Sequence, residues 1–101
     1  MVQYKWFPSG GGWKEQKECI APVELQTGSG TIRITAEGSI HLPQTADCQL
    51  YSLRENATMY NLTAREIALE PGYGVVIKLE GIGVLQVSRP AEPNGKPTEP
   101  R

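Results

Sequence analysis

His41 is the only histidine in the chain, so nucleophilic or acid–base catalysis that needs an imidazole has to use it. The residue lies between Ile40 and Leu42, in a stretch where apolar and polar side chains alternate. In a strand with one buried face, this alternation directs His41 away from its apolar neighbours and toward solvent. We therefore interpret it as a surface histidine and predict no catalytic residue.

Paired carboxylates could act without a histidine, because two acids on either side of a cleft can cleave a glycosidic bond. Most acidic residues of this chain fall at predicted turns or at outward positions of strands, where a solvated surface accounts for them. They are Glu24, Glu37, Asp47, Glu55, Glu66, Glu70 and Glu80. Since 101 residues also leave little volume for a deep cleft, we predict that the protein is not an enzyme.

Two glycine pairs, Gly72-x-Gly74 and Gly81-x-Gly83, invite comparison with phosphate-binding loops. Such loops open a helix, whereas these pairs lie between predicted strands and are followed by no Lys-Ser or Lys-Thr. The stretch 69–72, Leu-Glu-Pro-Gly, resembles the turns that enter strands in many jelly rolls and cupin-like barrels. A cupin metal site needs several histidines, so the resemblance extends to the turn alone. We expect neither a metal ion nor another cofactor.

An aromatic cluster near the N-terminus is the strongest functional signal. Tyr4, Trp6, Phe7 and Trp13 lie within ten residues, beside the triple glycine 10–12. In an extended segment Tyr4 and Trp6 share one face and Phe7 lies on the other. These four residues are our predicted partner-binding site, because Trp and Tyr are frequent anchors at protein interfaces. Two alternatives stay open: the aromatics seal the core of their own domain, or they form a platform for sugar rings.

Cysteine usage and acceptor motifs say little about compartment. Cys19 and Cys48 are too few for a disulfide framework and too far apart for a zinc site, so reduced thiols and a single disulfide both remain open. Asn56 and Asn61 each begin an Asn-x-Thr glycosylation pattern. The N-terminus lacks the apolar core of a signal peptide, so we expect synthesis in the cytoplasm and interpret both motifs as coincidental.

The composition excludes two classes of partner. Ten Lys and Arg against eleven Asp and Glu give a net charge of −1, without the basic excess that phosphate binding requires. No apolar run approaches the roughly 18 residues that span a bilayer. With 39% hydrophobic residues in 101, the chain is typical of one folded domain. We therefore predict a protein partner, with carbohydrate as the alternative, and neither nucleic acid nor membrane.

Residues 19–89 have the pattern of β-strands. Val and Ile are abundant, and strict alternation appears in 31–36, 39–42 and 73–80. It predicts that Ile32, Ile34 and Ala36 point inward, as do Val75, Ile77 and Leu79. Turn residues follow at 28–30, 37–38, 43–44, 70–72 and 80–81. The expected fold is all-β: a small sandwich, jelly roll or barrel of about 7–9 short, mostly antiparallel strands.

One segment of this domain has two interpretations. Thr63 and Glu66 have the spacing of a helix capping box, but a helix beginning there would have to end at Pro71. The alternative strand places Ile67 and Leu69 on one face. We favour the strand, because a two-turn helix gains little from propensity. Residues 65–88 would then form a three-stranded meander.

Three zones follow from these observations: an aromatic N-terminal arm or edge strand at 1–18, a β domain at 19–89 and a proline-rich, disordered tail at 90–101. This arrangement is similar in general appearance to small accessory proteins of phage particles, such as head-decoration or tail subunits. The resemblance implies a virion component. We predict a non-enzymatic structural protein that forms a homo-oligomer or docks on a larger assembly. The alternatives are a carbohydrate-binding module that uses the N-terminal aromatics and a small protein inhibitor.

Overall fold

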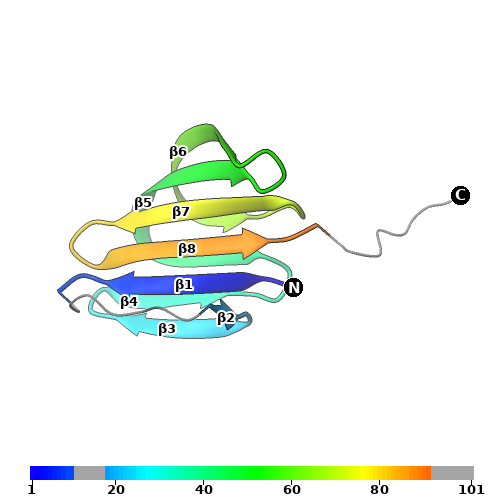
Figure 1. Ribbon diagram of the computed structural model, residues 1–101. Helices are drawn as coiled ribbons and strands as arrows, with labels where there is room; N and C mark the ends of the chain where they lie inside the picture. The colour runs from blue at the N-terminus through cyan, green and yellow to red at the C-terminus, as the bar shows by residue number, and fades with distance from the viewer. Residues whose placement is uncertain (11–17, 92–101) are drawn as a thin grey trace, which may run out of the picture.

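A computed structural model describes residues 1–10 and 18–91 of the chain, and this part is all-β (Figure 1). All the strand pairs are antiparallel. The strands are β1 (Gln3–Pro8), β2 (Cys19–Ile20), β3 (Val23–Thr27), β4 (Gly30–Ile34), β5 (Ser39–Ser52), β6 (Ala57–Ala68), β7 (Tyr73–Leu79) and β8 (Gly83–Arg89). Within these residues no helix is long and apolar enough to cross a membrane. The predicted fold class is confirmed.

The strands form one sheet that curls into a nearly closed barrel. Its order is β2-β1-β8-β7-β5-β4-β3, with β6 on the other edge of β5. The two end strands, β2 and β3, are joined by residues 21–22 alone, and Ala21 donates its N–H to the Val2 carbonyl at 2.8 Å. The two ends of the sheet therefore meet at a chain connection.

Strand β5 is bent so strongly that its halves belong to opposite sides of the barrel. Its first residues pair with β4 and its last residues with β7. A straight strand of 14 residues would be about 45 Å long. However, Ser39 pairs with Ala68 and Ser52 pairs with Tyr73. Because the connection from residue 68 to 73 spans at most about 18 Å, the two ends of β5 must approach one another.

The bend lies at Pro43, where the sequence predicts a turn. The strand continues through 43–44, so the predicted strand boundary is wrong, but the pairing of β5 with β6 shifts register between His41 and Ala46. Proline cannot donate to a ladder, and an irregular position of this kind tolerates it. Arg65 donates from Nε to the Leu42 carbonyl at 3.1 Å, which satisfies an acceptor beside the bend.

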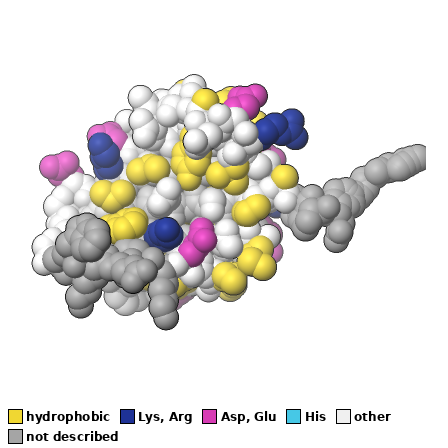
Figure 2. Space-filling view, in the orientation of Figure 1, with side chains coloured by type: hydrophobic (Ala, Val, Ile, Leu, Met, Phe, Trp, Pro, Cys, Tyr) yellow, Lys and Arg dark blue, Asp and Glu magenta, His cyan; other side chains and the backbone are white. Residues whose placement is uncertain are grey.

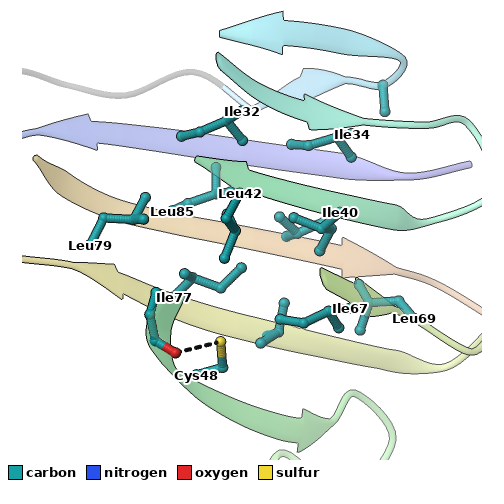
Figure 3. Packing of buried hydrophobic residues seen from close by; sticks show 14 of the residues in the cluster. Ile32, Ile34, Ile40, Leu42, Cys48, Ile67, Leu69, Ile77, Leu79 and Leu85 are labelled. Carbon is teal, nitrogen blue, oxygen red and sulfur yellow. Dashed lines mark hydrogen bonds between the residues drawn. The ribbon is translucent and has the colours of Figure 1, made fainter. Parts of the chain in front are cut away.

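The core fills the interior between the two halves of the sheet (Figure 3). Side chains from β4 and from β7 and β8 project toward one another, and Cys48 lies at the margin of the cluster. The alternation predicted for β4 and β7 is confirmed, since five residues are no more than 2% exposed: Ile32, Ile34, Val75, Ile77 and Leu79. Ala36 is exposed, contrary to the prediction, because β4 ends at Ile34 and Ala36 lies in the following turn.

Residues 63–68 belong to strand β6 rather than to a helix, and Ile67 and Leu69, the latter just past the end of the strand, are both buried as the strand interpretation predicts. The predicted meander is wrong in its first step. β7 pairs with β8, but β6 and β7 lie on opposite edges of β5 and do not pair with each other. The turn residues identify where a strand ends, whereas the partner strand depends on the bend in β5.

Candidate functional site

The structure distributes the predicted partner-binding aromatics over two faces of β1. Tyr4 and Trp6 are half-buried and pack against the core, whereas Phe7 is 38% exposed on the outer face. This follows the predicted alternation. Trp13 lies outside the described residues. Whether these four side chains bind a partner stays a prediction.

Strand β1 is held by its neighbours along its whole length. All six of its residues pair with β8, from Gln3 opposite Ser88 to Pro8 opposite Gly83, and its other edge pairs with β2 at Gln3 and Tyr4. The described part of the N-terminal zone thus includes a strand that is paired with β8 over its full length. Of the tail predicted at 90–101, residues from 92 onward lie outside the described residues.

Trp6 lies against a glycine of the neighbouring strand. A Cβ atom added to Gly83 would be 2.9 Å from Cη2 of Trp6 and 2.5 Å from the Phe7 carbonyl oxygen. Gly83 also has φ of +155°, which side-chain-bearing residues rarely adopt. The glycine therefore permits the indole and the β1 backbone to approach β8 closely.

Cys19 and Cys48, both within the described residues, are not joined by a disulfide. Cys48 is buried and its Sγ donates to the Ala46 carbonyl at 3.5 Å (Figure 3). Burial raises the pKa of the Cys48 thiol above its ordinary value. Cys19 is exposed and lies opposite Tyr4. Burial raises the pKa of the Tyr4 hydroxyl, with a further contribution from its hydrogen bond to the Cys19 side chain.

His41 takes part in a ladder of polar side chains across the outer face of β3, β4, β5 and β6. Glu24 pairs with Arg33, Arg33 with His41 and His41 with Glu66. Nε of Arg33 is 3.0 Å from Oε2 of Glu24, and Nδ1 of His41 is 3.1 Å from Oε2 of Glu66. The His41 and Glu66 side chains are 48% and 72% exposed, so water screens the pair. This confirms the outward orientation predicted for His41.

Strand β6 has one edge that the described strands leave unpaired. It pairs with β5 along one edge, and within residues 1–10 and 18–91 no strand pairs with its other edge, at the upper margin of Figure 1. We call this second edge, over residues 57–66, the open edge. Proteins usually protect such edges with lysine, proline or charge, because unpaired backbone groups attract another strand. Residues 57–64, Ala-Thr-Met-Tyr-Asn-Leu-Thr-Ala, contain none of these.

Two large apolar side chains lie beside the open edge. Met59 is 48% exposed and Tyr60 is 55% exposed. Both residues lie on β6 a few positions after the tip of the β5–β6 hairpin at 53–56. This site was not among the residues predicted from sequence. The run of eight residues without charge or proline was its signal, but only the strand order shows which edge is unpaired.

Within residues 1–10 and 18–91, no group of three or more His, Cys, Asp and Glu is placed to hold a metal ion. Comparison with models of protein families, with curated proteins and with solved structures found no match.

Proposed function

We propose that the protein is a non-catalytic structural subunit that associates by strand pairing at the open edge of β6. Its partner is a second copy of the chain or another subunit of a larger assembly. The observation that carries the proposal is an uncharged edge of eight residues with Met59 and Tyr60 exposed beside it. A strand added to this edge would satisfy its backbone donors and acceptors.

Strand addition at the open edge would supply two kinds of favourable contact. Each backbone hydrogen bond across the new strand pair contributes about 0.5–1.5 kcal/mol net. Tyr60 and Met59 would lose exposed apolar surface in the same step, and aromatic anchors at interfaces commonly contribute 2 kcal/mol or more, about thirtyfold in the dissociation constant. Association also costs about 4–15 kcal/mol in translational and rotational freedom, so the length of the new strand pair and the burial of the anchor set the affinity.

The direct test measures mass in solution over a range of concentrations. We expect species heavier than the 11.1 kDa chain in the unaltered protein. Tyr60→Lys introduces a charge at an exposed position, so it is expected to reduce association while leaving the far-UV circular dichroism unchanged.

Phe7→Lys is the matched control, because it places the same charge at an exposed aromatic residue of β1. If Phe7→Lys reduces the mass and Tyr60→Lys does not, the N-terminal aromatics carry the association and the open edge does not. A protein that remains a monomer at every concentration contradicts self-association. In that case only docking on a different subunit remains.

A further inference from the structure

The outer face of β1, β8, β7, β5 and β6 has a different character from the open edge. Its side chains form rows that cross the strands, because paired residues share a face. One row consists of Lys5, Gln86, Val76, Gln49 and Asn61. Four gaps between strands give this row a length of about 19 Å. Three of its five side chains are primary amides.

The adjacent row contains an aromatic ring that lies flat on the sheet. Tyr51 pairs with Gly74, and a Cβ atom at Gly74 would lie 2.5 Å from Cζ of the ring. The missing side chain therefore allows the Tyr51 ring to rest on the backbone of β7. The Tyr51 side chain is half-buried, so part of it stays accessible to solvent.

Two adjoining depressions hollow this face. The first, of about 480 Å³, is lined by Tyr51, Gln86, Ser88 and Lys5 among others. The second, of about 360 Å³, is lined by Gln49, Asn61 and Val76 among others. They adjoin because Gln86 of the first and Val76 of the second are paired residues.

The charges around these depressions balance. Lys5 and Glu18 both line the first, and Asp47 and Lys78, which are paired, line the second. In Figure 2, which views the molecule from this side, charged side chains occur in isolated places rather than in one patch of a single sign. A face of this kind does not favour a polyanion, which would need a basic surface.

We propose that this outer face binds a neutral oligosaccharide. Amide groups both donate and accept hydrogen bonds, as sugar hydroxyls do, so Gln86, Gln49 and Asn61 match a polyhydroxyl ligand. The accessible part of the Tyr51 side chain would stack against the apolar C–H face of one sugar ring. The row from Lys5 to Asn61 is longer than one sugar ring, so it fits an oligosaccharide better than a single sugar. The sequence-based carbohydrate alternative relied on the N-terminal aromatics, but Tyr4 and Trp6 pack against the core.

The test is a titration of the isotope-labelled, unaltered protein followed by amide NMR signals. The probes are maltohexaose, cellohexaose and chitohexaose, with an oligogalacturonate as the charged counterpart. We expect at least one neutral probe to shift the signals of Gly74, Gln86 and Ser88, and the charged probe to have no effect. If no neutral probe shifts these signals, or if the charged probe binds more tightly, the proposal is overturned.

Two tyrosine variants locate the binding energy. Tyr51→Ala removes the stacking ring and is expected to weaken binding about tenfold, whereas Tyr51→Phe keeps the ring and most of the affinity. Tyr60→Ala is the matched control, because this exposed tyrosine pairs with Leu50, which packs against the core, and so lies on the opposite face of the sheet from Tyr51. Equal losses for Tyr51→Ala and Tyr60→Ala overturn the assignment. If Tyr51→Ala fails to fold, the mapping on the unaltered protein and the Tyr51→Phe variant still decide the question.

Discussion

Two aromatic residues of this barrel lie on glycines, one inside and one outside. Trp6 lies against Gly83 on the inner side, where the indole packs against the core. Tyr51 lies on Gly74 on the outer side, where its side chain is half-buried. In both pairs a glycine makes room for a ring on the neighbouring strand.

The two pairs differ in the atoms that a side chain added at the glycine would meet. At Gly83 a new Cβ would meet the Phe7 carbonyl oxygen, which belongs to the backbone of β1. At Gly74 it would meet only the far end of the Tyr51 side chain. The inner pair therefore belongs to the framework of the barrel, whereas the outer ring can move without disturbing the sheet. The inner side of the sheet thus holds the ring that stabilises the fold, and the outer side holds the ring that is free to bind a ligand.

Gly83→Ala should have the largest effect on stability. The new methyl group clashes with backbone and the position requires an unfavourable φ, so we expect the free energy of unfolding to fall by about 3 kcal/mol. Chemical denaturation monitored by circular dichroism measures this. If Gly83→Ala lowers the free energy of unfolding no more than Gly74→Ala does, β1 and β8 can separate easily. The two glycine–aromatic pairs would then not differ as described.

Trp6→Ala should rank next. A fully buried tryptophan costs about 3–5 kcal/mol when truncated, so a half-buried one should cost about 2 kcal/mol. The same denaturation experiment applies, with Phe7→Ala on the outer side of β1 as its control. An unchanged stability for Trp6→Ala, together with a loss of oligomeric mass, would indicate that the indole serves a partner rather than the core.

Gly74→Ala should have an intermediate effect. Because the Tyr51 ring can rotate away, we expect a loss of only about 1 kcal/mol, roughly 4–8 °C in melting temperature. The near-UV circular dichroism signal should change, since the ring leaves its fixed position. If the melting temperature falls by 15 °C or more, the ring is locked and our description of the outer pair is wrong.

Tyr51→Phe should have the smallest effect on stability. The ring remains on Gly74 and only the hydroxyl is lost, so the free energy of unfolding should change by less than about 0.5 kcal/mol. Thermal melting beside the unaltered protein measures the change. A loss above about 2 kcal/mol would mean that the hydroxyl has a structural hydrogen bond, which would tie Tyr51 to the framework.

Local features of the fold were predictable from sequence, but pairing between distant strands was not. Alternation predicted the inward residues of β4 and β7, and the turn residues at 37–38 and 80–81 do join hairpins. Pro43 signalled an interruption correctly, but a bend and a turn have the same local signature. The separation of β6 from β7 follows from that bend, and so does the open edge.

The candidate sites could not be predicted either, because they depend on the pairing of distant strands. Tyr51, Gln49 and Asn61 come from two strands and meet residues of β7 and β8 only through the register of the sheet. The N-terminal aromatics were conspicuous because they are close in sequence. Consecutive residues of a strand, however, point to opposite faces of the sheet, as Trp6 and Phe7 show.

The bend in β5 couples the two sides of the barrel during unfolding. One continuous strand supplies a ladder to β4 at its beginning and to β7 at its end. If β4 or β7 separates from the sheet, part of β5 loses its hydrogen bonds. Since β5 is one continuous strand, its pairing on the other side of the barrel is weakened as well. We expect a single cooperative transition, in which amides of β4 and β7 exchange with solvent at the same, global free energy of opening.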